Sequence, residues 1–131
     1  MVPDAFTSVR LAVSAGEPLP GELFTRYRDE FHIEVIDGIG STEMGHIFIS
    51  NRPGAAVAGA SGFVVTGHEV RLLDDDGADV GTGVPGYLWL RGPASATGYW
   101  NRADATAHTF IDGWVRTGDV YECSEARVQD H

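Results

Sequence analysis

A glycine-rich segment that ends in two hydroxyl residues and a carboxylate carries side chains suited to phosphate and metal chemistry. It runs Asp37-Gly38-Ile39-Gly40-Ser41-Thr42-Glu43. Closely spaced glycines let a backbone pass against a flat or charged ligand, a threonine hydroxyl can donate to a phosphate oxygen, and a glutamate offers the hard oxygen that Mg²⁺ prefers. The same spacing is typical of a helix start, with Ser41 or Thr42 as the cap and Glu43 in the first turn. Spacing alone favours the helix start.

Asp119 and His46 are the other polar candidates, and each has a purely structural explanation. Asp119 follows Gly118, a pair that is typical of a turn. His46 is a single histidine among apolar neighbours, where a packing role is the commoner one. The histidines are also too widely spaced in the sequence to form a local metal-binding pair. The residue types therefore leave both roles open.

The charge balance excludes several classes of partner. Nineteen acidic residues against nine basic ones give a formal net charge of −10, and such a surface repels nucleic acids and anionic membranes. All the basic residues are arginine, which excludes mechanisms that need a side-chain amine from this chain. No apolar run approaches the roughly 20 residues of a membrane span. Because Cys123 is the sole cysteine, no intramolecular disulfide can form, and we expect a reducing, cytoplasmic compartment.

The first part of the chain is predicted to form a parallel strand–helix–strand unit. Apolar residues at every second position predict a half-buried strand over residues 9–14. A helix is predicted over residues 20–31, where four apolar residues share one face, and residues 33–36 resume a strand. A unit of this length makes a parallel pair with a right-handed crossover. The loops 14–18 and 37–43 then emerge at the same edge of the sheet, where ligands of open parallel sheets bind.

The second part is predicted to be rich in β-structure. Strands are expected over residues 69–73, 86–91 and 114–116, with a short helix near residues 103–110. Three tryptophans are expected to anchor this part rather than to contact a ligand: Trp89, Trp100 and Trp114. The length of 131 residues suits one compact domain.

Four short motifs in a fixed order give the chain a family likeness. They are SAGEPLP at residues 14–20, DGIGSTEM at 37–44, GYW at 98–100 and GWVRTGD at 113–119. Together they resemble the adenylate-forming (AMP-binding) superfamily of acyl-CoA synthetases and adenylation domains, and most of all its benzoate–CoA ligase type. The likeness implies an α/β segment of the large N-terminal domain, with the parallel unit in residues 1–60 and a barrel-like, β-rich subdomain in residues 61–122. Residues 123–131 depart from the family pattern and are expected to be disordered.

The resemblance implies a nucleotide site built from separate loops. The loop along one face of the adenine ring would comprise Ala15, Gly16, Glu17 and Pro18. The opposite side and the ring edge would be lined by Asp37, Gly38 and Ile39, with an aliphatic contact where most of the superfamily has tyrosine. Asp119 would accept hydrogen bonds from both ribose hydroxyls, which the two oxygens of a carboxylate allow.

The catalytic residues that the resemblance implies follow the adenine loop directly. Thr42 would donate a hydrogen bond to the α-phosphate, and Glu43 would bind Mg²⁺. The pocket for the carboxylic acid would be lined by Gly40, Ser41 and His46, with a packing role as the alternative for His46.

The activity that the resemblance implies is ATP-dependent ligation of a small carboxylic acid, aromatic by preference, to the thiol of CoA. The acid attacks the α-phosphate of ATP, and the resulting acyl-adenylate reacts with the thiol and releases AMP. ATP, Mg²⁺ and CoA would be the cofactors and co-substrates. The family's phosphate-loop lysine and its lid with the catalytic lysine are not in this chain. We therefore expect the segment alone to be inactive, and to self-associate or to pair with the missing parts of the enzyme.

Two alternative functions stay open at this point. The chain could belong to an adenylation domain that loads a carrier-protein thiol instead of CoA. It could also be a non-catalytic module that binds adenylates or acts as a scaffold. Because a scaffold has no need of Thr42, Glu43 and Asp119 together, their joint presence argues against that last reading.

Overall fold

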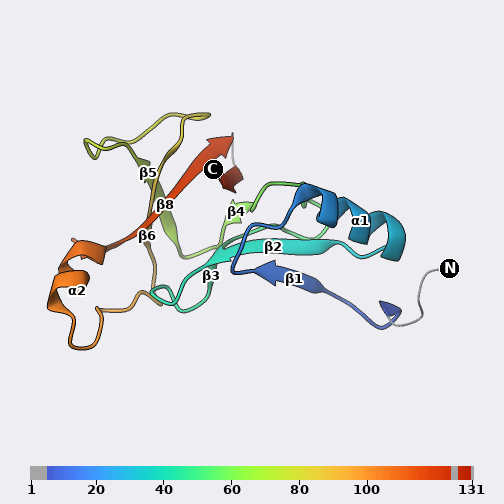
Figure 1. Ribbon diagram of the computed structural model, residues 1–131, viewed down its shortest axis with the longest axis horizontal. Helices are drawn as coiled ribbons and strands as arrows, with labels where there is room; N and C mark the ends of the chain where they lie inside the picture. The colour runs from blue at the N-terminus through green and yellow to red at the C-terminus, as the bar shows by residue number, and fades with distance from the viewer. Residues whose placement is uncertain (1–5, 125–126, 131) are drawn as a thin grey trace.

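The computed structural model describes residues 6–124 and 127–130, and it shows a mixed α/β fold with two sheets (Figure 1). The first sheet has the order β1-β2-β3-β4, with β1 at Ala12–Ala15, β2 at Val35–Gly40, β3 at Ile47–Ser50 and β4 at Phe63–Val64. The helix α1, at Gly21–Phe31, connects β1 to β2. In the described part of the chain, no helix is both long and apolar enough to cross a membrane.

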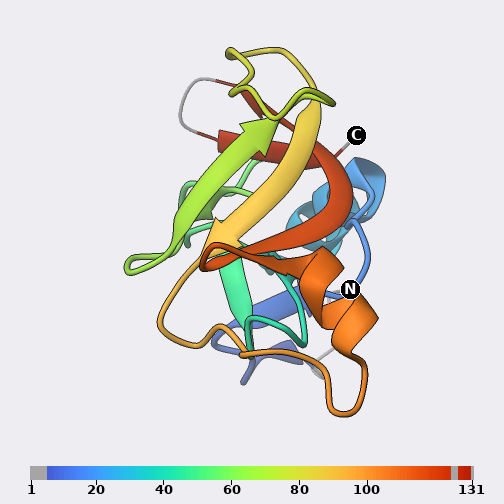
Figure 2. The same ribbon diagram turned by 90° about the vertical axis from the view of Figure 1, so that its left-hand side faces the viewer.

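The second sheet curls into a half-barrel beside the first (Figure 2). Its order is β5-β6-β8-β7, and β9 pairs with β8 outside that path. The strands are β5 at Glu69–Leu73, β6 at Gly86–Arg91, β7 at Phe110–Ile111, β8 at Trp114–Ser124 and β9 at Arg127–Asp130, and the helix α2 lies at Ala103–Thr109. The predicted strands over residues 69–73 and 86–91 are confirmed with the same boundaries.

The predicted parallel pair is confirmed. The strands β1 and β2 run parallel, from the Ala12–Val35 pair to the Ala15–Gly38 pair. The helix between them begins after Pro20, whose fixed φ suits that position, and ends at His32, which adopts the left-handed conformation. Phe24 is the buried residue of the helix and Leu23 is 39% exposed, so the apolar face of α1 is only partly covered.

The chain does not form a helix after the glycine-rich segment, so the favoured helix-start interpretation is wrong. The strand β2 continues through Gly40, and residues 41–46 form a tight turn into β3, which runs antiparallel to β2. A side chain at Gly40 would press against the backbone of His46, so glycine allows this close approach. The turn delivers Phe48 and Ile49 into the core, which a helix starting at Ser41 would not do.

One expectation about the second part differs from the structure. Trp100 does not anchor the β-rich core: it is 96% exposed in the loop before α2, while Trp89 and Trp114 are half-buried.

The last residues of the described chain are Cys123 and Ser124 at the end of β8 and the strand β9, whose backbone pairs antiparallel with β8. Residues 125–126 and 131 lie outside the described part. The disorder expected from Cys123 onwards stays a prediction.

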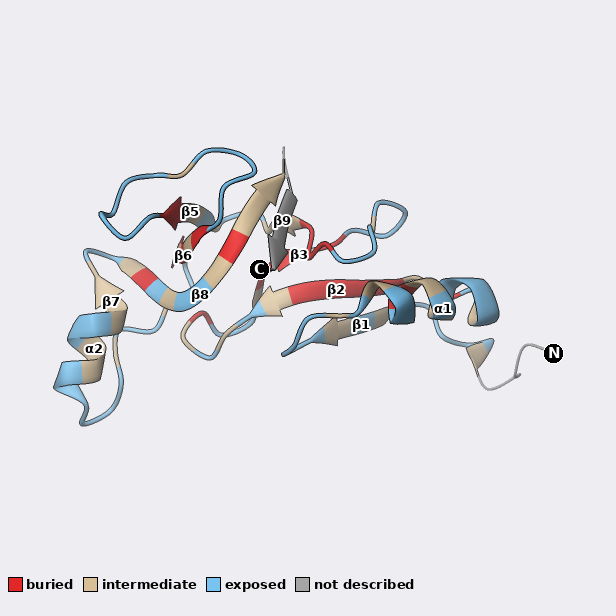
Figure 3. Cartoon of the chain, turned by 45° about the horizontal axis from the view of Figure 1, so that its top comes forward, coloured by how far each residue is buried: buried red, intermediate tan, exposed pale blue. Residues whose placement is uncertain are grey.

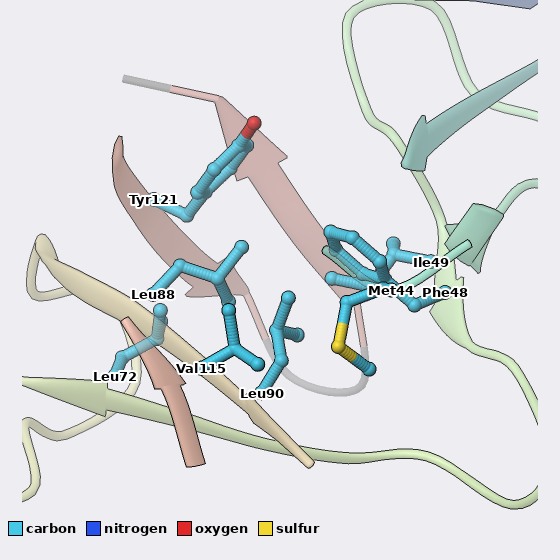
Figure 4. Packing of buried hydrophobic residues seen from close by; sticks show 8 residues of the cluster. All are labelled: Met44, Phe48, Ile49, Leu72, Leu88, Leu90, Val115 and Tyr121. Atoms are coloured by element: carbon cyan, nitrogen blue, oxygen red, sulfur yellow. The ribbon is translucent and has the colours of Figure 1, made fainter. Parts of the chain in front are cut away.

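One hydrophobic core joins the two sheets (Figure 4). Met44, Phe48 and Ile49 enter it from the first sheet and its turn. The second sheet contributes Leu72, Leu88, Leu90, Val115 and Tyr121. The halves that were predicted to meet at residue 60 therefore share a core, and β4 belongs to the first sheet although it follows that boundary.

The strand β1 is the edge of the first sheet, and apolar side chains on it and just before it are exposed. The strand predicted over residues 9–14 begins only at Ala12, so Val9 and Leu11 precede it. Val9, Leu11 and Val13 are 41%, 50% and 56% exposed, whereas most of β2 is buried (Figure 3). An edge strand with exposed aliphatic side chains is a surface on which another strand can pair. The expected self-association, or pairing with further parts of an enzyme, stays a prediction.

Gly62 provides a test of how closely the loop 51–62 packs on β3. Gly62 has φ +106° and Gly67 has φ +94°, so an alanine is strained at either position, but only at Gly62 would its Cβ collide with the backbone of Ser50 and Asn51. We expect Gly67→Ala to lower the free energy of unfolding by about 1–2 kcal/mol and Gly62→Ala to lower it by about 1–3 kcal/mol more. Urea denaturation followed by tryptophan fluorescence measures both. Equal losses would contradict the close packing.

Candidate functional site

A cavity of about 250 Å³ lies at the carboxyl end of the parallel pair and takes its walls from both sheets. The loop after β1 contributes Gly16, Glu17 and Pro18, and the end of β2 and the turn after it contribute the run from Asp37 to Ser41. The second sheet contributes three residues of β8: Thr117, Asp119 and Tyr121. Phe48 and Ser61 complete the lining. Segments about 100 residues apart in the sequence thus line the same cavity. The parallel register of β1 and β2 brings the loop after β1 next to the end of β2.

Most of the residues proposed from the sequence line this cavity. They are Gly16, Glu17, Pro18, Asp37, Gly38, Ile39, Gly40, Ser41 and Asp119. Four others do not: Ala15 is the last residue of β1, and Thr42, Glu43 and His46 lie in the turn beyond Ser41. His46 is exposed there, so it neither packs in the core nor lines this cavity.

Four lining residues were missed by the sequence analysis: Phe48, Ser61, Thr117 and Tyr121. Thr117 and Tyr121 lie two residues before and two residues after Asp119 on β8. This proximity to Asp119 is the one sequence feature that could have indicated that they line the cavity. Ser61 belongs to a loop that looks flexible in the sequence. Asn51 fixes that loop, because its side-chain amide donates to the Ala60 carbonyl at 2.5 Å while its backbone N–H donates to the Asp37 carbonyl at 2.8 Å.

The cavity has an acidic lining. Three lining residues, Glu17, Asp37 and Asp119, carry carboxylates, and within the described part of the chain no lining residue is basic. Asp37 is only 8% exposed, whereas Glu17 and Asp119 are exposed. Carboxylates accept hydrogen bonds and have none to donate when ionised. The cavity is therefore suited to a neutral ligand part that carries hydroxyl or amino donors, and any anionic part of such a ligand is best placed outside these three groups.

Glu43 is held by a residue of a distant loop. The Tyr99 hydroxyl donates to Glu43 Oε1 at 2.5 Å, and the backbone N–H of Ala96 donates to the Glu43 carbonyl at 2.7 Å. The Tyr99 ring packs against Phe110 at 5.4 Å between centroids, and its backbone N–H donates to Thr106 Oγ1 at 2.9 Å. The hydrogen bond from Tyr99 is the main cause of a lowered pKa of the Glu43 carboxyl, and it raises the pKa of the Tyr99 hydroxyl. Glu43 is thus kept ionised with one oxygen engaged by Tyr99.

Asp119 lies in an irregular part of β8. The preceding residue, Gly118, has φ +85°, a conformation that glycine adopts without strain. The hydroxyl of Thr117 makes two hydrogen bonds here. It donates to the Leu88 carbonyl on β6 and accepts from the Asp119 N–H. The side chain of Asp119 reaches the cavity from this point, so its position depends on tertiary contacts of β8 rather than on the local turn alone.

Comparisons with known proteins converge on one group of enzymes. A family model described as AMP-binding enzyme matches residues 2–100. The chain is 48% identical over 113 residues to a 4-hydroxybenzoate–CoA/benzoate–CoA ligase of Rhodopseudomonas palustris, which covers 86% of this chain and 21% of the relative. It is 42% identical over 129 residues to an anthranilate–CoA ligase of Pseudomonas aeruginosa, which covers 98% of this chain and 25% of the relative.

Solved structures agree with the sequence relatives. A benzoate CoA ligase from Burkholderia xenovorans superposes with a TM-score of 0.91 at 42% identity, covering 96% of this chain and 26% of that one. An anthranilate CoA ligase in complex with anthranoyl-AMP gives a TM-score of 0.90 at 41% identity, over 92% of this chain and 24% of that one. The chain therefore spans about a fifth to a quarter of the length of the proteins it matches, and the match assigns its fold to the N-terminal domain of acyl-CoA synthetases.

The bond between Tyr99 and Glu43 makes a prediction about pH. Tyr99→Phe removes the hydroxyl and keeps the ring on Phe110, so the pKa of Glu43 should rise towards its ordinary value of 4.5. A lowered pKa in the folded state stabilises the fold above the unfolded pKa, and this contribution disappears as the pH falls through the folded pKa. We therefore expect the variant to be less stable at neutral pH by under about 1 kcal/mol, because both groups are partly exposed, and equally stable in acid.

NMR titration of the Glu43 side-chain carboxyl measures the shift directly. Tyr27→Phe is the matched control, because Tyr27 packs on Phe31 in α1, whereas the hydroxyl that bonds to Glu43 is that of Tyr99. If Glu43 titrates identically in the wild type and in Tyr99→Phe, the hydrogen bond is not formed in solution.

Proposed function

Because this chain belongs to the family of AMP-binding enzymes, we propose that its cavity binds the adenosine part of an adenylate, as part of an AMP-forming ligase that joins an aromatic carboxylic acid to CoA. The relatives named above act on benzoate, 4-hydroxybenzoate or anthranilate. Their common feature is an aromatic carboxylate, which supports an acid of that class for this protein. We propose CoA rather than a carrier-protein thiol as the acceptor because these relatives are CoA ligases.

The observation that carries the proposal is the shared cavity of Gly16, Asp37 and Asp119. These residues come from the three segments to which the resemblance assigns adenine and ribose contacts. The acidic lining suits adenosine, which offers ribose hydroxyls and an amino group as donors and carries no charge of its own. Phosphates would then lie towards the turn that follows Ser41, away from the three carboxylates that line the cavity.

Each of the lining segments has a proposed contact. Gly16, Glu17 and Pro18 would lie along one face of the adenine ring, with Ala15 supporting the loop from the end of β1. Asp37, Gly38 and Ile39 would face the other side and the edge of the ring. Asp119 would accept hydrogen bonds from the two ribose hydroxyls.

The turn beyond the cavity carries the proposed phosphate and metal contacts. Thr42 is exposed and free to donate its hydroxyl to the α-phosphate, and Gly40, Ser41 and His46 would face the carboxylic acid. Glu43 fits Mg²⁺ because hydrogen bonds, chiefly the one from Tyr99, lower the pKa of its carboxyl and keep it ionised. The described residues contain no group of three acidic, histidine or cysteine side chains that could hold a metal. One protein carboxylate together with phosphate oxygens and water is a common way in which Mg²⁺ is bound.

In the proposed reaction, these residues position the reactants and do not transfer protons. A carboxylate attacks the α-phosphorus of ATP, the bond to pyrophosphate breaks, and an acyl-adenylate results. Mg²⁺ bound there would neutralise phosphate charge. The cavity would fix the nucleoside, and Thr42 would orient the α-phosphate towards the acid, which reduces the entropic cost of bringing the two reactants together.

Nucleotide binding is tested by calorimetric titration of the chain with AMP. We expect Asp119→Ala to weaken AMP binding about tenfold or more, because two hydrogen bonds to a charged acceptor are lost. Asp75→Ala is the matched control, because it removes an exposed carboxylate of the β5–β6 connection and so changes the net charge equally. If both variants bind AMP as tightly as the wild type, Asp119 has no ribose role.

Turnover is a separate measurement. The resemblance assigns one lysine to a phosphate loop and one to a lid, and this chain contains no lysine. We therefore expect the 131-residue chain with ATP, Mg²⁺ and benzoate to show no exchange of labelled pyrophosphate into ATP, even where it binds AMP. Robust exchange would show that the missing lysines are dispensable.

A further inference from the structure

The strand β8 bulges where it passes the centre of β6. Tyr87 of β6 pairs with Val120, and the next pair along is Trp89 with Arg116. Leu88 alone therefore stands opposite Thr117, Gly118 and Asp119. Bulges bend a strand and redirect its side chains, and they are frequent next to binding sites. This bulge is the point from which Asp119 reaches the cavity.

The hydroxyl of Thr117 makes hydrogen bonds on both sides of the bulge. Thr117 Oγ1 donates to the Leu88 carbonyl at 3.0 Å and accepts from the Asp119 backbone N–H at 3.1 Å. The Leu88 side chain is fully buried in the core, so this carbonyl is a fixed anchor. The two bonds connect the backbone of Asp119 to a buried residue of β6.

The arrangement also limits what Thr117 itself can do. A threonine hydroxyl has one proton to donate, and here the Leu88 carbonyl takes it. Although Thr117 lines the cavity, it has no proton left for a ligand. Its influence on a ligand is therefore expected to act through the position of Asp119.

We propose that Thr117 is a positioning residue: its hydroxyl sets the direction of the Asp119 carboxylate and thereby the selectivity of the cavity for a ribose with both hydroxyls. This inference rests on the proposed nucleotide-binding function. Gly118 adopts φ +85°, the conformation that the bulge needs, without strain. The hydroxyl of Thr117 supplies the constraint.

The test compares AMP with 2′,3′-dideoxy-AMP, which lacks both groups that Asp119 would bind. Thr117→Val keeps the size and branching of the side chain and removes the hydroxyl, and Thr117→Ser keeps the hydroxyl. By calorimetry, we expect Thr117→Val to weaken AMP binding about three- to tenfold, in line with the loss of one or two hydrogen bonds, and to leave the dideoxy ligand unchanged. Thr117→Ser should bind AMP within about twofold of the wild type.

Each outcome separates positioning from a general structural role. Equal weakening of both ligands by Thr117→Val, or no weakening of either, overturns the proposal. If the wild type does not distinguish AMP from the dideoxy ligand, or Asp119→Ala has no effect, the ribose assignment fails and the inference fails with it. If the ribose assignment holds and only Thr117→Val behaves as the wild type, the inference alone fails.

A measurement on the wild type covers the case in which Thr117→Val does not fold. The Asp119 backbone amide should exchange its hydrogen more slowly than that of an unbonded surface residue, because Thr117 Oγ1 accepts from it. Exchange at the rate of an unprotected amide overturns the proposal.

Discussion

The cavity depends on a hydrophobic core that belongs to neither sheet alone. Phe48 of β3 and Tyr121 of β8 are buried in that core, and the same two residues line the cavity. The floor of the site is therefore the surface of the core, and the two walls keep their separation only while the sheets stay packed. The shared core is also consistent with β3 following the glycine-rich segment, since Met44 and Phe48 are buried in one cluster with residues of the second sheet.

The distribution of charge divides the molecule into two surfaces with different properties. Arg71 pairs with Asp79 and Arg91 pairs with Glu69, and both guanidinium groups also approach the Trp114 ring. These arginines thus form ion pairs and ring contacts on the second sheet and do not line the cavity. The cavity, in contrast, is lined by carboxylates. For an adenylate, this arrangement would leave the phosphate to a hydroxyl, to backbone groups and to a metal ion, which is consistent with the exposed turn at Thr42 and Glu43.

Three polar connections hold the site together, and each joins segments that are distant in the sequence. Tyr99 holds Glu43 across 56 residues, and Thr117 holds the Asp119 bulge against Leu88 across 29. Asn51 ties the loop before β4 to Asp37. Tyr99 bonds to the side chain of Glu43, whereas Thr117 and Asn51 bond to the backbone of Asp119 and of Asp37. The geometry of the site is therefore a property of the assembled sheets.

The sequence by itself determined the parallel unit, the strands over residues 69–73 and 86–91, and most of the cavity lining. Alternating apolar residues, Pro20 at the start of a helix and motifs in a fixed order are local signals, and they persist whatever the rest of the chain does. Only the tertiary structure decided the turn after Ser41, the exposure of Trp100, the bulge at Gly118 and the bond from Tyr99 to Glu43. These features arise because burial and hydrogen bonding satisfy groups that are far apart along the chain, and a local pattern carries no record of which distant group will be the partner.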